Sequence, residues 1–514
     1  MASSTVTKAH EKTFMEKALD VVEIVGNRVP HPAVIFVILI GIVILLSQIL
    51  YMMGASVSYE VINPDTHKLE KVTTAARSLL TGEGIRFMFT GVVQNFMNFQ
   101  AVGVIIVAMV GVGVAEEAGL VSALIRKLVI IAPPWALTYI LAAVGIMSSI
   151  AADAGYLVLI PLAAAAFLSV GRHPLAGLAL AFAAVASVFL VNIFIVPVDG
   201  ILVGITNDAI HIVDPNKNIG LTSNFWFSTA SMVVMTVVVA LITDKIVEPR
   251  LGKYTGDYEE PSTGMSDADA RGLKFAFWGL IAVVIFIGLL VGPANAPLRN
   301  PETGAIIGNS PFMNSLIVTI AITFFATGLA FGIGAGTIKK TNDVVNAMIK
   351  AIQTLAGLIF LLLIISQFLA YFNYTNMSTL AALSLAEILQ RANLDALWLL
   401  LGFVVVVFIL DLIITGAVPK WALFAPVFVP LLMRLNVPPD AVLAAYRVGD
   451  SPINAITPLN AYFAMIVVFC QRYVKDAGVG TVVALMLPYV VIIAGVWLVL
   501  LAAWQLSGLP WGFG

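Results

Sequence analysis

Nine stretches of this chain are apolar for long enough to cross a lipid bilayer, and this repetition limits its possible folds more than any other feature. Backbone polar groups in hydrocarbon must be hydrogen-bonded within their own segment, so such stretches cross as helices of about 20 residues. Apolar residues make up 60% of the 514 residues and charged residues only 11%, too few to cover a water-soluble protein. We therefore predict an all-α polytopic membrane protein with spans near 32–53, 100–118, 175–198, 225–247, 273–293, 311–336, 351–372, 441–470 and 479–506.

Two further apolar stretches, 135–170 and 396–434, are each too long for one span. Each is interrupted near its middle, by MSSIAADAG in the first and by DLIITGAVPKWA in the second. A helix that enters the membrane, breaks and returns to the same side has this pattern, and its tip must be surrounded by protein. We predict two re-entrant helical hairpins.

Lysine and arginine residues predict the orientation of the spans. If the N-terminal segment 1–30 lies in the cytoplasm, 17 of the 27 basic residues fall in cytoplasmic segments and 8 in external ones. Basic residues gather on the cytoplasmic side of membrane proteins, so this bias favours a cytoplasmic N-terminus and hairpins that return to their own side. Without a small-residue cleavage site after a short apolar core, we expect no removable signal peptide.

The polar segment 248–272 is predicted to be a cytoplasmic linker between two membrane halves, 31–247 and 273–514. Each half contains one hairpin followed by an interrupted span. Because the first hairpin enters from inside and the second from outside, this layout is that of an inverted repeat.

The second interrupted span contains the polar stretch YRVGDSPINAITPLNAYF. Thr457 and Pro458 are typical of an N-cap followed by a first helical proline, so we expect the helix to unwind between Gly449 and Thr457 and then restart. The free N–H and C=O groups of such a break can bind anions and cations. A proline-kinked span in which Arg447 and Asp450 pair as neighbours is the alternative. Ionisable residues within the membrane favour the binding-site interpretation.

Further acidic residues lie in the membrane segments, each with a structural alternative. Asp153, at the tip of the first hairpin, would cap the returning half-helix or hold a coupling cation. Asp411 would be a protonated carboxyl bonded to backbone, or a proton or cation site. Asp199 would cap a helix near the outer surface or line the cavity, which we favour. The candidate cation-coupling residues are Asp153, Asp411, Asp450 and Thr457, and Na⁺ is possible at the three aspartates.

Lys420 and Trp421 follow the break in the second hairpin. A lysine can extend its charge toward water, but the position within a hairpin favours a buried charge. Trp421 would offer an aromatic face to a planar ligand, although a tryptophan in a hairpin more often only packs. Asn192 and Asn454, one in each interrupted span, are further candidates for the same cavity.

Several stretches together resemble the AbgT family, the bacterial p-aminobenzoyl-glutamate transporters. They are ADAGYLVLIPLAA, KWALFAPVFVPLL, AAYRVGDSPINAITPLNAYF, GVGTVVALMLPY and the closing GLPWGFG. The resemblance implies an inner-membrane homodimer with nine spans and two hairpins per subunit. It also implies uptake of p-aminobenzoyl-glutamate, or efflux of sulfonamide-type antimetabolites, driven by a Na⁺ or H⁺ gradient. The pocket positions implied by the matching motifs are Trp421, Arg447, Asp450 and Pro458, with Pro439 nearby and Asp199 in the first half.

The resemblance fits the residues of the breaks. A glutamate conjugate has two carboxylates and an aromatic ring. Half-helix N-termini, Arg447 and Lys420 would suit the carboxylates, and Trp421 would suit the ring.

Three positions depart from the family pattern. Val418 stands where a small serine is usual and cannot cap the restarting half-helix, so Thr415 would have to replace it. Asp411 stands where asparagine is common and adds a titratable group. The stretch SVFLVN before Asn192 replaces a run richer in glycine and serine. These departures affect the expected substrate and coupling ion rather than the fold.

Three functions compete for such a chain. Broken helices in inverted halves favour a cation-coupled transporter of a small aromatic carboxylate over an ion channel, for which no filter-like motif is present. An intramembrane aspartyl protease would use Asp411 and Asp450, but Lys420 and Arg447 would keep both carboxylates ionised. No Walker A motif and a net charge of −2 give no sign of ATP or nucleic-acid binding. We expect no enzymatic activity and no cofactor beyond the coupling ion.

Overall fold

The computed structural model describes residues 32–62, 69–150, 155–256, 265–307, 310–381, 384, 395–411, 416–457, 460 and 462–513. Helices make up most of this part of the chain. Its strands are β1 (Ser56–Ile62) and β2 (Leu69–Ala75), which pair antiparallel with Ser56 opposite Ala75. Seven of the described helices are long and apolar enough to cross a membrane, or eight if one bent pair counts as a span. The prediction of an all-α polytopic membrane protein is confirmed.

Six of the long helices coincide with predicted spans. They are α2 (Pro32–Met52), α11 (Phe225–Ile242) with its extension α12 (Glu248–Leu251), α13 (Asp267–Val291), α15 (Leu316–Ala335), α17 (Ala356–Tyr374) and α23 (Val479–Ser507). The seventh, α20 (Ala417–Arg434), is the second arm of the predicted hairpin 396–434. The predicted spans 175–198 and 441–470 are each broken into shorter helices, and the predicted span 100–118 is part of a bent pair, so only six of the nine predicted spans are single long helices.

One predicted span continues as a bent pair. α5 (Gln100–Ala118) is followed by α6 (Leu120–Ile130), and the two meet at 58°. Gly119 forms the bend, with a φ of 93° in the left-handed region that glycine adopts most easily. α6 was not predicted, because its basic residues Arg126 and Lys127 are typical of a cytoplasmic loop.

Shorter helices connect the spans. They are α3 (Gly82–Thr90), α4 (Val92–Met97), α14 (Pro311–Asn314) and α16 (Thr341–Thr354). The sequence analysis also missed α16, because its Asn, Asp, Lys and Gln residues resemble a polar loop.

The first predicted hairpin consists of α7 (Leu137–Met147) and α8 (Ile160–Ser169), which a π-helical turn precedes from Gly155. The interrupted span after it begins as α9 (Pro174–Phe182) and remains helical to Ser187. Residues 188–196 are not helical, and α10 (Pro197–Ile210) then begins at a proline. The predicted breaks in both segments are therefore present.

The second half repeats this order of elements. α19 (Ala396–Asp411) and α20 are separated by a break, and α21 (Pro439–Asp450) follows. A 3₁₀ turn (Pro452–Ala455) comes next, and α22 (Phe463–Gln471) ends the interrupted span. Each half thus has two hairpin helices followed by a helix that breaks and resumes.

The predicted restart of the second interrupted span at Pro458 is wrong, because α22 begins at Phe463. Asn460 supplies the physical reason. Its side-chain amide donates to the carbonyl of Asn454 at 2.9 Å, and its side-chain oxygen accepts from the backbone N–H of Tyr462 at 3.0 Å. Asparagine side chains that bond nearby backbone groups compete with helix formation in this way.

The expected effect of Val418 is also corrected. α20 begins at Ala417 with Gly416 in the N-cap position, so Val418 is the second helical residue and does not stand where a side chain would cap the helix. Thr415, the expected substitute, lies outside the described residues.

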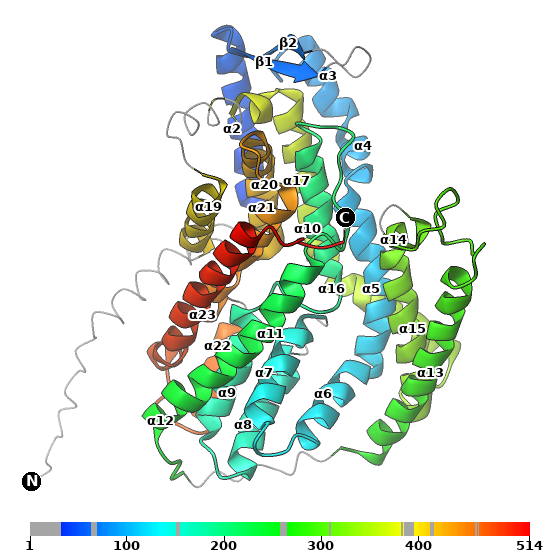
Figure 1. Cartoon of the computed structure of the whole chain (residues 1–514), viewed down its shortest axis with the longest axis vertical. Coiled ribbons are helices and arrows are strands. Elements are labelled where there is room, and N and C mark those ends of the chain that lie inside the picture. The colour runs from blue at the N-terminus through cyan, green and yellow to red at the C-terminus, as the bar shows by residue number, and fades with distance from the viewer. Residues whose placement is uncertain are drawn as a thin grey trace, which may run out of the picture.

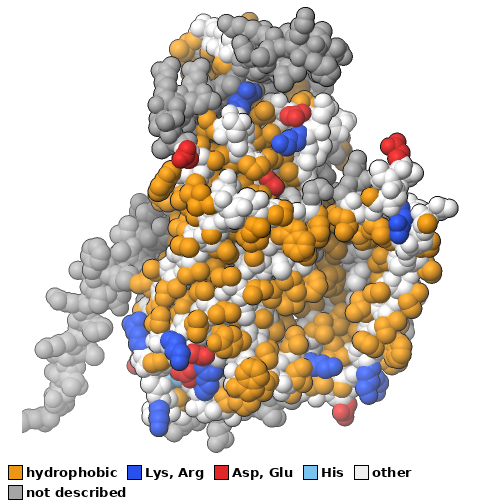
Figure 2. Space-filling view, in the orientation of Figure 1, with side chains coloured by type: hydrophobic (Ala, Val, Ile, Leu, Met, Phe, Trp, Pro, Cys, Tyr) orange, Lys and Arg blue, Asp and Glu red, His pale blue; other side chains and the backbone are white. Residues whose placement is uncertain are grey.

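Figure 1 shows α13 and α15 at one edge of the molecule beside α5, with α7, α8 and α9 lower in the view than α20 and α21. In the same orientation, Figure 2 shows a broad band of hydrophobic side chains, with charged side chains gathered above and below it. Many of the large apolar side chains in the described helices are exposed, among them Leu45 on α2 and Leu289 on α13. Such a surface fits a lipid environment.

Glycines allow α5 and α15 to approach closely. A Cβ atom at Gly111 of α5 would overlap the backbone of Ala321, and one at Gly328 of α15 would lie 2.5 Å from the Cα of Ala115. Small residues at helix contacts serve this purpose in membrane proteins.

We predict that Gly111→Ala destabilises the protein by about 1–3 kcal/mol, because the added methyl group forces the two helices apart. Thermal unfolding in detergent measures the effect. Gly103→Ala on the same helix is the matched control, since nothing lies within 4 Å of its added Cβ. Equal unfolding temperatures for the two variants would contradict the close contact.

Candidate functional site

The unwound segments of the two interrupted spans lie against each other. The hydroxyl of Ser187 donates to the carbonyl of Pro452 at 3.2 Å, and the N–H of Leu190 donates to the hydroxyl of Ser451 at 3.4 Å. These bonds join positions more than 250 residues apart in the chain. The breaks therefore form one junction, and the buried ionisable residues gather around it.

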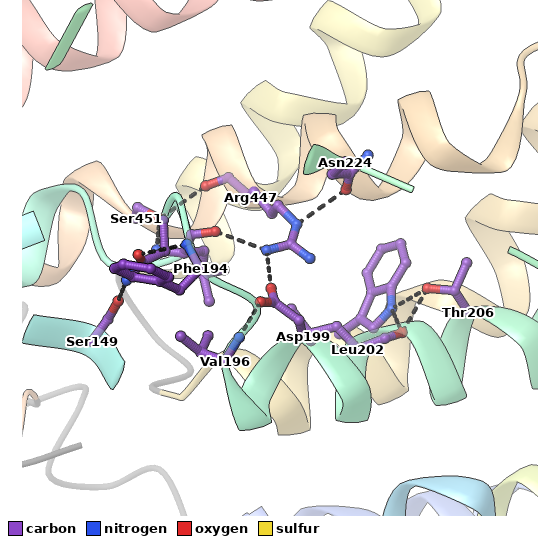
Figure 3. A network of polar contacts seen from close by, with 12 residues as sticks. Ser149, Phe194, Val196, Asp199, Leu202, Thr206, Asn224, Arg447 and Ser451 are labelled. Carbon is purple, nitrogen blue, oxygen red and sulfur yellow. Dashed lines mark hydrogen bonds and ion pairs between the residues drawn. The ribbon is translucent and has the colours of Figure 1, made fainter. Parts of the chain in front are cut away.

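Arg447 crosses this junction. Its Nη1 lies 2.6 Å from Oδ1 of Asp199 and donates to the carbonyl of Leu190 at 2.8 Å, while its Nε donates to Oδ1 of Asn224 at 3.1 Å. Figure 3 shows Arg447 between Asp199 and Asn224, which come from different elements. The guanidinium is buried, and a buried charge needs such partners.

Asp199 has the capping role that was considered for it, whereas its position in a substrate cavity stays a prediction. Its Oδ2 accepts from the N–H of Val196 at 2.8 Å and so caps α10, while its Oδ1 pairs with Arg447. The alternative in which Arg447 pairs with Asp450 is wrong, since the ion pair of Arg447 is with Asp199 and that of Asp450 is with Lys420.

A second cluster lies where the break of the second hairpin meets the end of α21. Nζ of Lys420 lies 2.7 Å from Oδ1 of Asp450 and also contacts Oδ1 of Asp411. The hydroxyl of Tyr446 lies 2.8 Å from the same oxygen of Asp450 and 2.5 Å from the carbonyl of Ala417. Lys420, Asp411 and Asp450 are all 0% exposed.

This cluster holds two carboxyl groups and one amine. If all three were ionised, one negative charge would remain in a site without water contact, and such a charge is costly to bury. Both carboxylate oxygens of Asp411 and Oδ2 of Asp450 have no hydrogen-bond partner among the described residues, although Oδ1 of Asp411 contacts Lys420 as an ion pair. The cluster can therefore accept one proton or one further positive charge.

Trp421 is fully buried, as the packing interpretation expects. Its Nε1 donates to the hydroxyl of Thr206 at 2.9 Å, and its ring centroid lies 4.5 Å from that of Tyr446. Trp421 therefore joins the second hairpin to α10 of the first half. In this arrangement its ring faces protein.

The asparagine candidates lie at the breaks. The side-chain amide of Asn192 donates to the hydroxyl of Ser149 at 3.0 Å and to the carbonyl of Met147 at 3.2 Å, which joins the first hairpin to the first unwound segment. The amide of Asn454 donates to the carbonyl of Asp450 at 2.9 Å and extends the end of α21 by one bond.

The remaining candidates are not brought into these clusters. Pro439 is the buried first residue of α21, two helical turns before Arg447, and Thr457 is fully buried in the second unwound segment. Asp153 and Pro458 lie outside the described residues. Among the described residues, no group of three or more His, Cys, Asp or Glu could hold a metal ion, so Na⁺ binding stays a prediction.

Sequence reasoning missed Asn224, Tyr446 and Thr206. Tyr446 could have been found, because it lies one helical turn before Asp450 and shares its face. Asn224 and Thr206 gave no local signal, since each contacts a residue more than 200 positions away.

Comparisons with known proteins agree with this architecture. The model of the AbgT putative transporter family matches residues 17–514. The chain is 34% identical over 493 residues to a p-aminobenzoyl-glutamate transport protein of Escherichia coli (strain K12), covering 96% of this chain and 95% of that protein.

Two transporters of known structure resemble this chain. The YdaH transporter of Alcanivorax borkumensis has a TM-score of 0.87 and 39% identity, over 94% of this chain and 100% of that chain. MtrF of Neisseria gonorrhoeae, from a class of antimetabolite efflux pumps, has a TM-score of 0.89 and 36% identity, over 95% of this chain and 97% of that chain.

We predict that Lys420→Met destabilises the protein by about 3–5 kcal/mol, because two buried carboxylates lose their cation. Thermal unfolding in detergent measures the loss, and Asp411→Asn in the same chain should recover part of it. Lys350→Met is the control: that lysine pairs with Glu117 at 2.9 Å but its side chain is 61% exposed, so the change should cost less than about 1 kcal/mol. An unfolding temperature of Lys420→Met equal to that of wild type would refute the charge cluster.

Proposed function

This chain belongs to the AbgT family of membrane transporters, and we propose that it is a cation-coupled secondary transporter of aromatic carboxylates that works by alternating access. The observation that carries the proposal is the junction of two broken helices, one from each half, around buried charges of both signs. Broken helices that meet within the membrane are the usual binding sites of secondary transporters.

Arg447 is the proposed ligand for a substrate carboxylate. Its Nε and Nη1 are bound to protein, whereas its Nη2 has no hydrogen bond to any described residue. A guanidinium with a free nitrogen can bind a carboxylate without losing its existing partners. p-Aminobenzoyl-glutamate, the substrate named for the relative from Escherichia coli, offers two carboxylates and one aromatic ring.

Trp421 is the proposed partner for the substrate ring, but only after a movement. Its ring lies against Tyr446 and its N–H is bound to Thr206 of α10, so both are covered in this conformation. Separation of the second hairpin from α10 would expose the ring. Alternating access requires a movement of this kind between the two halves.

The Lys420 cluster is the proposed coupling site. Its unbalanced negative charge would be neutralised by H⁺ or Na⁺, and a site that binds a cation in one state and releases it in another couples transport to a gradient. The two carboxylates do not face each other as a protease dyad, because Lys420 contacts both. A homodimer in a bacterial inner membrane, with a cytoplasmic N-terminus, is part of the same proposal.

The test is uptake of labelled p-aminobenzoyl-glutamate into proteoliposomes, with Na⁺ and pH gradients imposed separately. We expect saturable uptake driven by one gradient, and loss of that uptake in Asp450→Asn. Absence of saturable transport under either gradient, in folded protein and in both directions, would contradict the proposed substrate. Sulfonamides and other aromatic carboxylates would then be tried.

Asp411→Asn tests the coupling site separately. One carboxylate then faces one ammonium, so the cluster is balanced without a cation. We expect this variant to exchange substrate across the membrane at equal concentrations but to lose acceleration by the gradient. Asp395→Asn is the control, because Asp395 is exposed at the start of the same hairpin. Full gradient dependence in Asp411→Asn would show that the cluster does not couple.

A further inference from the structure

Asn224 occupies the N-cap position of α11 but does not cap that helix. Its Oδ1 accepts from Nε of Arg447 at 3.1 Å, and its Nδ2 donates to the carbonyl of Asp440 at 2.8 Å. Asparagine is among the residues most favoured as helix caps, because its side-chain oxygen accepts the free N–H groups of the first turn. Both side-chain groups of Asn224 are instead committed to α21.

The C-terminal tail takes over the capping of α11. The backbone carbonyl of Trp511 accepts the N–H groups of Trp226 and Phe227, at 3.0 and 3.2 Å. These are the second and third residues of α11, whose N–H groups an N-cap side chain normally binds. A carbonyl from the end of the chain therefore occupies the position that the Asn224 oxygen would otherwise take.

Close backbone contact holds the tail in place. The N–H of Phe513 donates to the carbonyl of Thr222 at 3.2 Å. A Cβ atom at Gly512 would overlap the carbonyl oxygen of Thr222 and lie 2.5 Å from the carbonyl carbon of Ser223, so only glycine fits there.

Aromatic packing also holds the tail. The ring of Trp511 is buried, with its centroid 5.2 Å from that of Phe227, and the ring of Phe513 lies 4.9 Å from Trp226. The tail therefore contacts the first turn of α11 both through its backbone and through its aromatic rings.

We propose that the C-terminal segment 508–513 is a positioning element for substrate binding: by capping α11 through Trp511, it leaves Asn224 free to orient Arg447. This inference rests on the proposed function, because it takes Arg447 as the carboxylate ligand. Without the tail, the side chain of Asn224 would turn back to the free N–H groups of α11. Arg447 would then lose its hydrogen bond to Asn224 and keep its ion pair with Asp199 (Figure 3). Its Nη2 would no longer be held in one orientation.

A double-mutant cycle with Gly512→Ala and Asn224→Ala tests the proposal, with p-aminobenzoyl-glutamate as the probe. We measure its affinity and the unfolding temperature for wild type, both single variants and the double variant. Each single variant should bind about tenfold more weakly, since a hydrogen bond to a charged group is lost. The double variant should bind no more weakly than Asn224→Ala alone, because the tail acts through Asn224.

The two substitutions should affect stability in a different way from affinity: their combined effect on the unfolding temperature should be more than additive. In Gly512→Ala the oxygen of Asn224 can still cap α11, so the unfolding temperature should fall only slightly. In the double variant no cap remains, so the fall should exceed the sum of the two single effects. This arm needs no substrate, and it therefore tests the exchange of the α11 cap between Trp511 and Asn224 even if wild type fails to bind p-aminobenzoyl-glutamate.

Gly495→Ala is the matched control, because Gly495 lies on the preceding helix α23 and nothing surrounds its added Cβ within 4 Å. It should bind and unfold like wild type. A second cycle uses a chain that ends at Ser507, and so lacks the tail, in place of Gly512→Ala. Additive losses of both affinity and stability, in both versions of the cycle, would overturn the proposal and leave the tail with only a general packing role.

Discussion

The need to pair every charge inside the membrane determines how the two halves of this protein meet. Arg447 of the second half finds its carboxylate in Asp199 of the first, and this pair lies beside the place where both spans are unwound. The polar groups freed by unwinding are then satisfied across the junction, as the bond from Ser187 to Pro452 shows. An isolated broken helix would be too costly in lipid, so each half requires the other.

The contacts between the halves are reciprocal. Tyr156 follows the break in the first hairpin, and its ring stacks on Tyr462 of the second half with centroids 4.1 Å apart. Trp421 follows the break in the second hairpin, and its N–H donates to Thr206 of the first half at 2.9 Å. Each hairpin therefore places an aromatic side chain against the broken helix of the opposite half. Two copies of one arrangement with opposite orientation would produce this exchange.

The sequence predicted features that depend on run length and residue type. Long apolar runs located the continuous helices, and the interrupted runs located the break after Met147 and the one before Ala417. Amphipathic helices such as α16 were not predicted, because their polar residues resemble those of a loop. The ionisable residues of the site were also identified, but not their partners. Nothing local predicts that Arg447 pairs with Asp199, 248 residues away, rather than with Asp450 on its own helix.

The two charge clusters differ in a way that bears on coupling. Arg447 and Asp199 balance each other, so a substrate carboxylate at Arg447 adds one negative charge to the junction. Lys420 faces two carboxyl groups, those of Asp411 and Asp450, so this cluster has one acidic group more than it has basic groups. Both clusters involve α21, on which Arg447 and Asp450 are three residues apart. An anionic substrate at Arg447 would therefore increase the benefit of a proton or cation at the Lys420 cluster, because opposite charges attract strongly where water is absent. Coupling between substrate and cation would then follow from electrostatics, with α21 as the common support.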